Sequence, residues 1–355
     1  MKKVDIVIGS NYGDEGKGTV VANLTKGYAN ILNILTNGGS QRGHSIFTCD
    51  GSFTFQHFGS GTYHGADNYY SAWYILNPIQ FVKEYEQLVR KPKHIYRDRR
   101  CRWSTPYDVM ANLITEEQKG RLASCGMGIW MTVQRCNHTP IKLFNEFIIL
   151  QPEKQIEYLN TVKVYYEKFL TVPDKWKDMW NSENIQKHFL SDCSIMYNLT
   201  EEIELRSLDY DNLIFENGQG LLLSDTGKDT SDTTPSNTGI HYALGMANEI
   251  GISDITAHYV TRPYLTRHGD GEMENQSSRD ELSKDVLEDR TNHFNEHQGE
   301  LRYGKLDINS LKNRILEDVG NVKYQLDITH CDEMDRISEF KKYFDTVNIY
   351  DSPLV

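Results

Sequence analysis

The chain has 355 residues, enough for one large α/β domain or two smaller ones. Its 50 acidic and 38 basic residues give a net charge of −12, which excludes polyanionic nucleic acid as a bulk partner. The six cysteines lie far apart without a C-x-x-C pair, and no stretch is apolar enough for a signal peptide or a membrane span. We therefore expect a cytoplasmic protein without a zinc site, a disulfide framework or a membrane partner.

Short apolar runs separated by polar or glycine-containing segments predict a doubly wound, mostly parallel sheet of buried strands. These runs are residues 4–8, 31–35, 213–215, 255–260, 324–328 and 347–349. Residues 152–170 place apolar side chains on one helical face and begin with a proline suited to a first turn. We expect a single α/β domain over residues 1–355, with 90–210 as a largely helical subdomain and the polar 269–300 segment as surface loops near a ligand.

The first predicted strand ends in a glycine-rich loop, residues 9–19 (GSNYGDEGKGT), and a helical pattern follows. Strand, glycine loop and helix are typical of a P-loop-like phosphate-binding loop, in which Lys17 faces phosphate oxygens. It is not a standard Walker A loop, because Asn11 replaces the first glycine and Asp14 and Glu15 lie inside the loop. A carboxylate beside phosphate needs a divalent cation or a proton to accept, so Asp14 is predicted to do one or both.

A second glycine loop, residues 37–45 (NGGSQRGHS), follows the second predicted strand. In a parallel sheet it opens at the same carboxyl edge as the first loop, so the two loops face one ligand. His44 lies directly after the last glycine, and this position favours a functional histidine over an ordinary loop histidine.

The two loops together, Gly-Asp-Glu-Gly-Lys-Gly and then Gly-Gly-x-x-x-Gly-His-Ser, resemble adenylosuccinate synthetase. The resemblance continues through residues 215–220 (FENGQG), 236–238 (SNT) and 260–262 (VTR). It implies a Mg²⁺-dependent ligase in which a nucleoside triphosphate phosphorylates the 6-oxygen of a purine monophosphate, and L-aspartate then displaces that phosphate.

The resemblance also assigns roles to single residues. Asp14 is expected to remove the purine N1 proton and to bind Mg²⁺ together with the Gly43 carbonyl. His44 is expected to donate to the departing γ-phosphate, with Lys17 as the phosphate lysine and Gln41 near the oxyanion. The expected triphosphate site comprises Asn11, Gly13, Glu15, Gly16, Lys17, Gly18, Thr19, Gly43, His44, Ser45, Thr329, His330 and Asp332.

The expected purine monophosphate site comprises Asp14, Ser40, Gln41, Ser124, Cys125, Gly126, Arg135, Asn217, Gln219 and Thr234. The resemblance implies that Arg135 reaches the 5′-phosphate across a homodimer interface, so that two subunits share their sites. Gly299 and Arg302 are expected to bind L-aspartate.

The chain departs from the family in two loops. Residues 297–303 (HQGELRY) keep only Arg302 of the family's arginines, one of which normally reaches the ribose 2′-hydroxyl, so a deoxynucleotide is suggested. Residues 329–332 (THCD) replace the family's guanine-reading Thr-Lys-Leu-Asp, so the resemblance does not imply a preference for GTP. Members of the phage-encoded branch of the family can use ATP or dATP instead of GTP.

With these departures, its compact length and Asn217, the chain resembles the phage-encoded branch of the family, the 2-aminoadenylosuccinate synthetases. These enzymes join dGMP to L-aspartate for the synthesis of diaminopurine DNA. As a member of this branch, the protein would act in the host cytoplasm. Two alternatives stay open: the ordinary reaction of IMP, L-aspartate and GTP, and a nucleotide-binding switch without ligase activity.

Overall fold

A nine-stranded sheet forms the centre of the computed structural model, which describes residues 2–48, 51–120, 124–225, 233–286, 289, 292, 294 and 297–351. The strand order is β16-β15-β11-β1-β10-β2-β5-β7-β9, and neighbouring strands pair in parallel. The strands are β1 (Lys3–Gly9), β2 (Ile31–Leu35), β5 (Asp67–Tyr70), β7 (Ile95–Arg97), β9 (Glu201–Glu202), β10 (Asn212–Gly220), β11 (Ile255–Thr261), β15 (Lys323–Ile328) and β16 (Val347–Ile349). All six predicted strands are among them, and the predicted α/β class with a mostly parallel sheet is confirmed.

Both faces of the sheet are covered, which explains why its strands read as apolar runs. In β1, Ile6 and Ile8 join one core cluster, while Val7 points to the other face and packs with Val20 and Val21. Val20 and Val21 belong to α1 (Lys17–Thr25), and the opposite face is covered by α9 (His241–Glu249) and α11 (Ile308–Val319). A short helix, α12 (Ile337–Phe340), packs against the same cluster.

Strands β1 and β2 are consecutive in the chain but are not neighbours in the sheet, because β10 lies between them. Phe215 of β10 is in register with Ile6 of β1 and with Ile34 of β2. The carboxyl ends of β2, β10, β1, β11 and β15 therefore lie side by side, and the five segments that follow them can meet at one edge.

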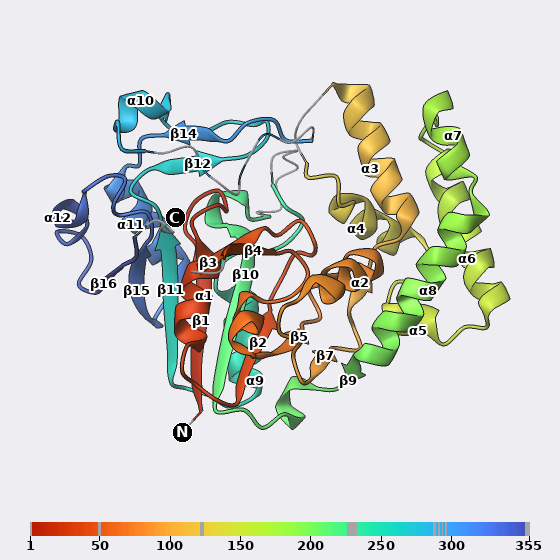
Figure 1. Cartoon of the computed structure of the whole chain (residues 1–355), viewed down its shortest axis with the longest axis horizontal. Helices are drawn as coiled ribbons and strands as arrows, with labels where there is room; N and C mark the ends of the chain where they lie inside the picture. The colour runs from red at the N-terminus through yellow and green to blue at the C-terminus, as the bar shows by residue number, and fades with distance from the viewer. Residues whose placement is uncertain are drawn as a thin grey trace.

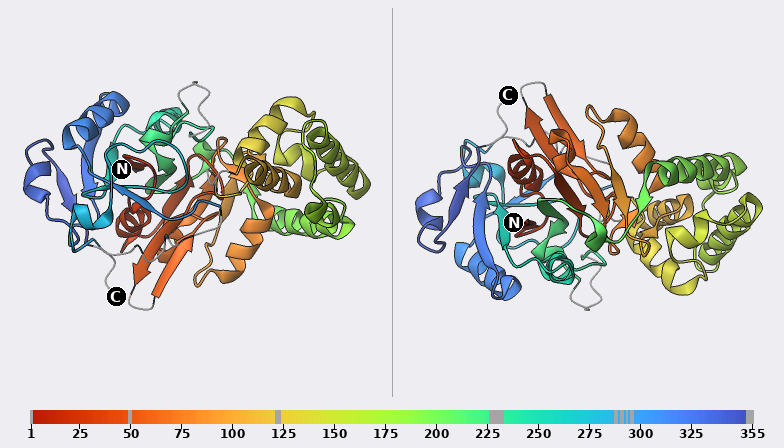
Figure 2. Two further views of the ribbon diagram at one scale, coloured as in Figure 1. Left: turned by 90° about the horizontal axis from the view of Figure 1, so that it is seen from above. Right: turned by 90° about the horizontal axis from the view of Figure 1, so that it is seen from below.

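The helices between residues 106 and 199 gather beyond the β7 and β9 end of the sheet, as two perpendicular directions of view show (Figures 1 and 2). They are α3 (Pro106–Lys119), α4 (Ile129–His138), α5 (Phe144–Ile148), α6 (Pro152–Glu167), α7 (Asp174–Trp180) and α8 (Glu183–Leu199). Helix α6 is the helix predicted to begin at Pro152. A second core cluster around Trp103 and Tyr158 fills this region together with α2 (Pro78–Gln87). None of the described helices is both long and apolar enough to cross a membrane.

Three small sheets and three short 3₁₀ turns complete the described structure. A sheet of β12 (Leu265–Arg267), β14 (Arg302–Gly304) and β13 (Gln276–Ser277) lies over the carboxyl edge of the large sheet, with α10 (Arg279–Leu282) beside it (Figure 1). The second small sheet pairs β3 (His44–Thr48) with β4 (Gly51–Phe55), and the third pairs β6 (Ile75–Leu76) with β8 (Arg102–Trp103). The 3₁₀ turns are η1 (Ser60–His64), η2 (Leu205–Ser207) and η3 (Leu221–Leu223). Part of the polar 269–300 segment, namely 287–288, 290–291, 293 and 295–296, lies outside the described residues.

A buried histidine joins three strands of the large sheet. His258 on β11 bonds through Nε2 to Asp5 of β1 and through Nδ1 to Asp327 of β15, both at 2.9 Å. Burial alone would lower the pKa of His258, but the two carboxylates outweigh burial and raise this pKa to about 9. Because the folded state binds the proton more tightly, the stabilisation is complete below about pH 6.5 and is lost as the pH rises through about 9.

We therefore expect the free energy of unfolding to fall by on the order of 1–3 kcal/mol between pH 6.5 and pH 9.5. Urea unfolding at several pH values measures this decline, and His258→Gln should flatten it. An identical decline in the His258→Gln variant would show that other groups cause it.

Candidate active site

The first glycine loop is held together by its own acidic and basic side chains. The Glu15 carboxylate accepts the backbone N–H groups of Asn11 at 2.8 Å and Gly13 at 2.9 Å. Lys17 Nζ lies 2.6 Å from the Gly13 carbonyl oxygen and 3.2 Å from Glu15 Oε2, and the lysine is buried. The loop therefore ends with its lysine fixed at the start of α1, where Gly16 adopts a φ of 86° as the N-cap. This is the arrangement that a phosphate cradle needs.

Two further segments pack closely against this loop. A Cβ atom on Gly18 would lie 2.5 Å from the Ser45 carbonyl oxygen, so β3 can cross the first turn of α1, which contains Thr19, only over a glycine. At the end of β10, Gly220 allows an equally close approach to the Asn11 carbonyl. The predicted residue Gln219, with a φ of 65°, turns the chain at this point.

The segment after β15 also rests on the first loop, as a triphosphate site would require. Thr329 Oγ1 donates to the Glu15 carbonyl oxygen at 2.7 Å. His330 follows with a φ of 57° and its Nδ1 lies 2.9 Å from Thr329 Oγ1, whereas Asp332 is exposed. The structure thus brings Thr329 to the first glycine loop, with His330 beside Thr329, while Asp332 lies at the surface.

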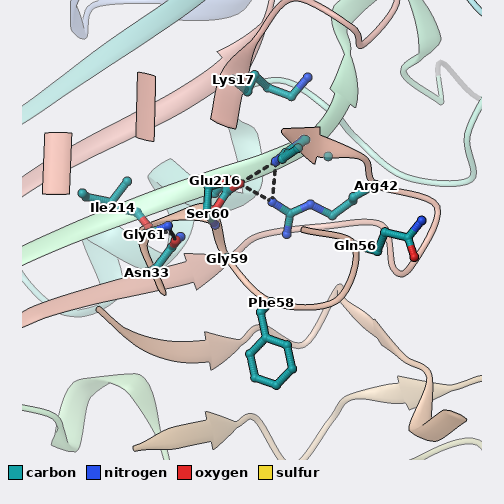
Figure 3. Close-up of polar contacts among 12 residues, drawn as sticks. Lys17, Asn33, Arg42, Gln56, Phe58, Gly59, Ser60, Gly61, Ile214 and Glu216 are labelled. Carbon is teal, nitrogen blue, oxygen red and sulfur yellow. Dashed lines mark hydrogen bonds and ion pairs between the residues drawn. The ribbon is translucent and has the colours of Figure 1, made fainter. Parts of the chain in front are cut away.

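His44, after the second glycine loop, shares a carboxylate with a neighbouring arginine. Glu216 Oε1 lies 2.5 Å from His44 Nδ1 and 2.9 Å from Arg42 Nη2, and Ser60 donates its N–H and Oγ–H to the same carboxylate (Figure 3). Burial is the largest cause that lowers the pKa of His44 to about 4; Arg42 adds to it and Glu216 opposes it. The imidazole is therefore neutral at pH 7 and is oriented by a fixed carboxylate. Arg42 and Glu216 were not assigned roles from the sequence.

Asp14 faces His268, a histidine to which no role was assigned from the sequence. Asp14 Oδ2 lies 2.9 Å from His268 Nδ1, and Arg262 Nε donates to the Asp14 backbone carbonyl at 2.7 Å. Burial opposes the charge on Asp14, but His268, Arg262 and Lys17 outweigh burial and lower the pKa of Asp14 below its usual value. The carboxylate is ionised at neutral pH and can accept a proton or bind a cation.

Several buried polar atoms around the loops have no hydrogen-bond partner among the described residues. They include Ser40 Oγ, Gln41 Oε1 and Nε2, Asn217 Oδ1, His268 Nε2 and Arg302 Nε. An unsatisfied buried polar group costs about 1–3 kcal/mol, so a site rich in such atoms suits a polar ligand that supplies the partners. All but His268 belong to the predicted monophosphate or L-aspartate residues.

The predicted monophosphate segment lies beside the predicted L-aspartate segment. Ser124 Oγ accepts hydrogen bonds from Asn112 Nδ2 at 2.8 Å and from the Gly126 N–H at 3.2 Å. The His297 ring lies 3.6 Å from the position of a Cβ on Gly126, which places residues 297–302 next to this segment. Burial raises the pKa of Cys125 to about 11, so its side chain is a neutral thiol. Further along, the Thr234 N–H donates to the Leu223 carbonyl at 2.8 Å and so fixes the predicted threonine.

Arg135 is engaged inside its own chain. Its side chain is fully buried, pairs with Asp108 at 2.8 Å, and donates to Tyr158 Oη at 3.0 Å and to the Trp103 carbonyl at 2.6 Å. Each nitrogen of the guanidinium thus has a partner inside the chain, which favours a structural role over the expected contact with a 5′-phosphate across an interface. The homodimer with shared sites stays a prediction.

Arg302 is also largely engaged within the chain. Its Nη2 donates to the carbonyls of Gly269 at 2.6 Å and Gly271 at 3.0 Å, and its Nη1 donates to Gln276 Oε1 at 3.0 Å. Its Nε has no hydrogen-bond partner among the described residues and could contact L-aspartate. Gly299, with a φ of 70°, lies in the adjoining segment as expected.

The residues fit the predicted Mg²⁺, although no group of three or more His, Cys, Asp or Glu side chains that could hold a metal occurs in the described ranges. Mg²⁺ at a phosphate site usually needs only one or two protein oxygens, the rest coming from phosphate and water. Asp14 provides an ionised carboxylate, and the predicted second ligand, Gly43, is exposed beside the second loop.

Comparison with known proteins places this site in a family. The sequence matches the adenylosuccinate synthetase family over residues 6–343. An adenylosuccinate synthetase from Acaryochloris marina is 25% identical over 284 residues, covering 75% of this chain and 61% of that protein. The chain therefore spans about three fifths of the length of this curated relative.

Two solved structures share the fold. The fully ligated adenylosuccinate synthetase from Plasmodium falciparum is similar with a TM-score of 0.68 and 20% identity, over 94% of this chain and 78% of that one. The succinoaminodeoxyadenylate synthetase of cyanophage S-2L, bound to dGMP and to dATP as an energy donor, has a TM-score of 0.66 and 11% identity, over 99% and 91%. Because the family match runs through nearly the whole chain, the chain belongs to the adenylosuccinate synthetase family.

Proposed function

We propose that the chain is a carbon–nitrogen ligase that joins L-aspartate to C6 of a purine nucleoside monophosphate and cleaves a nucleoside triphosphate. The observation that carries this proposal is the placement of an ionised Asp14 and a neutral, carboxylate-oriented His44 on two glycine loops that meet at one sheet edge. Membership of the adenylosuccinate synthetase family supports it.

In this proposal Asp14 accepts the N1 proton of the purine, and the resulting 6-oxyanion attacks the γ-phosphorus as the nucleoside diphosphate leaves. In this proposal Lys17 and the backbone N–H groups at the start of α1 would bind the phosphates. Glu216 fixes the His44 ring through Nδ1, so that Nε2 can donate once the phosphate charge favours a proton there. Mg²⁺, when bound through Asp14 and the Gly43 carbonyl, would neutralise phosphate charge. The amino group of L-aspartate then attacks C6 and loses a proton, and the C6–O6 bond breaks, so that O6 leaves with the phosphoryl group as inorganic phosphate.

We further infer that dGMP is the preferred monophosphate, as in the phage branch. Asn217 Nδ2 donates to the carbonyls of Thr238 at 3.0 Å and Gly239 at 2.7 Å, which fixes the amide so that its buried Oδ1 faces away from them as a free acceptor. The 2-amino group of guanine supplies a donor, and hypoxanthine has no such group. The fold likeness to the cyanophage synthetase, whose structure holds dGMP, supports this inference.

A single set of assays tests both statements. Phosphate release is measured with dGMP or IMP, with and without L-aspartate, and with ATP, dATP or GTP as donor. We expect release to depend on L-aspartate and to be fastest with dGMP. Phosphate release that does not depend on L-aspartate would favour the nucleotide-binding switch and contradict the proposed ligase activity. A preference for IMP would be compatible with the ligase activity and would indicate the ordinary adenylosuccinate reaction.

Asn217→Ala should lower kcat/KM for dGMP by up to about tenfold and leave kcat/KM for IMP nearly unchanged, because one hydrogen bond to the 2-amino group is lost. Ser40→Ala is the matched variant, since Ser40 Oγ is the other unpartnered candidate acceptor. If Ser40→Ala reduces the preference for dGMP and Asn217→Ala does not, the assignment to Asn217 is wrong.

A further inference from the structure

Two asparagines lie side by side in the large sheet, where most buried side chains are apolar. Asn33 of β2 and Asn68 of β5 are register partners on adjacent strands, and both are fully buried. The Asn68 side-chain oxygen accepts the Gly59 N–H at 2.8 Å. The Asn33 side-chain oxygen accepts the Gly61 N–H, also at 2.8 Å (Figure 3). The asparagine pair therefore holds the start of η1 on both sides of Ser60.

The two glycines allow this segment to approach the sheet closely. A Cβ atom on Gly59 would overlap the side-chain oxygen of Asn33, and a Cβ atom on Gly61 would lie 2.8 Å from Thr25 Cγ2. Burying an amide side chain costs free energy unless its hydrogen bonds are satisfied. Because the backbone of residues 59–61 satisfies the oxygens of Asn33 and Asn68, their place in the strands is explained by the segment that they hold.

The segment presents Ser60 to the candidate site. The Ser60 N–H donates to Glu216 Oε2 at 2.9 Å and its hydroxyl donates to Oε1 at 2.7 Å, so one residue contacts both oxygens and resists rotation of the carboxylate. Burial opposes the charge on Glu216, but Arg42 and His44 outweigh burial and lower the pKa of Glu216 below its usual value. An ionised carboxylate can only accept a hydrogen bond, so His44 Nδ1 donates to Oε1. The orientation of the carboxylate thus sets the direction of His44 Nε2.

We propose that Ser60 is a positioning residue for phosphoryl transfer, acting on the His44 ring through the Glu216 carboxylate. The asparagine pair of β2 and β5 keeps Ser60 in place. This inference rests on the proposed ligase function and adds to it a group that acts on the reaction through the protein, without a substrate contact of its own.

Ser60→Ala removes the hydroxyl and keeps the N–H that donates to Glu216. We expect it to lower kcat about five- to tenfold, the value of one hydrogen bond, and to leave each KM within about twofold of wild type. Exchange of the β,γ-bridging oxygen of labelled triphosphate, with dGMP present and L-aspartate absent, reports formation of the 6-phosphoryl intermediate and should slow by the same factor.

Ser104→Ala is the matched control. Ser104 is also a buried serine, and its hydroxyl donates to the Leu76 carbonyl at 3.3 Å, away from Glu216. This variant loses one buried hydrogen bond as Ser60→Ala does, but it should keep kcat within about twofold of wild type. Thermal unfolding shows that both variants are folded.

A double-mutant cycle with His44→Asn tests whether Ser60 acts through the histidine. His44→Asn removes Nε2, so the orientation that Ser60 imposes no longer affects a group that can donate to phosphate. In this background Ser60→Ala should lower kcat by less than about twofold, because residues that act as one unit are not additive.

Proton NMR tests the position of the ring without turnover. A buried imidazole N–H that donates to a carboxylate gives a signal far downfield, and the signal of His44 is identified by its loss in His44→Asn. Ser60→Ala should shift or broaden this signal, whereas Ser104→Ala should leave it unchanged.

Three results would overturn the assignment. One is an unchanged kcat in Ser60→Ala, and another is an unchanged His44 signal in the same variant. The third is an additive loss of kcat in the cycle, which would mean that Ser60 acts elsewhere. A wild-type enzyme without L-aspartate-dependent phosphate release would instead overturn the ligase proposal, and the NMR measurement would still decide whether Ser60 positions His44.

Discussion

Asp14→Asn is expected to reduce turnover by at least about 10²- to 10⁴-fold, the usual contribution of a general base, while the affinity for the purine monophosphate changes little. The substitution keeps the size of the side chain and removes its negative charge. Without that charge the residue neither accepts the N1 proton nor attracts a cation, and its contact with His268 loses its ionic character. Steady-state phosphate release and isotope exchange measure the chemical effect, and calorimetric titration with dGMP measures binding.

Glu15→Gln is the matched control, because Glu15 is the other carboxylate of the same loop. Glu15 accepts two backbone N–H groups and contacts Lys17, so its loss should weaken triphosphate binding rather than the proton transfer. If Asp14→Asn keeps more than about a tenth of wild-type turnover, the loss is smaller than the loss of a general base predicts. Asp14 would then be only a structural carboxylate of the loop.

Arg135→Met is expected to lower the free energy of unfolding by about 3–5 kcal/mol, because it leaves the Asp108 carboxylate buried without its partner. Both side chains have 0% exposure, and Asp108 also accepts a hydrogen bond from Tyr166. Asp108→Asn combined with Arg135→Met should recover part of the loss. Urea unfolding measures the stability of each variant.

The same variant should leave the KM for dGMP and the turnover per folded molecule within about twofold of wild type. A raised KM with unchanged stability would mean that Arg135 contacts the phosphate after all. The pair of measurements therefore decides between the structural role seen here and the role suggested by the sequence.

The parts of the fold that could be predicted are those whose side chains are apolar on both faces. Ile6 and Val7 of β1 point to opposite core clusters, and such strands are recognisable from composition alone. Strand β5 was not predicted, because Asp67 and Asn68 interrupt its apolar pattern. Both are buried and satisfied by distant groups: Asn68 accepts the Gly59 N–H, and Asp67 accepts the Tyr210 hydroxyl.

The candidate site also has parts that could be predicted from the sequence and parts that could not. The two glycine loops are local motifs, so their positions followed from the strand that precedes each one. His268 could not be paired with Asp14, because 254 positions separate them and the contact depends on how the small sheet lies over the carboxyl edge. The surroundings of Arg135 could not be predicted for a related reason: its partners, Asp108 and Tyr158, come from α3 and α6, and only packing shows that they surround it.

The position of β10 between β1 and β2 has a consequence for synthesis of the chain. Both glycine loops leave the ribosome within the first 45 residues, yet the strand that joins β1 to β2 begins only at Asn212. At roughly 5–20 residues per second, on the order of ten seconds or more pass before β10 is made. During that time β1 and β2 each keep an unpaired edge, which is a hazard for aggregation. The nascent protein should therefore need protection by a chaperone, and no fragment ending before residue 212 should bind nucleotide.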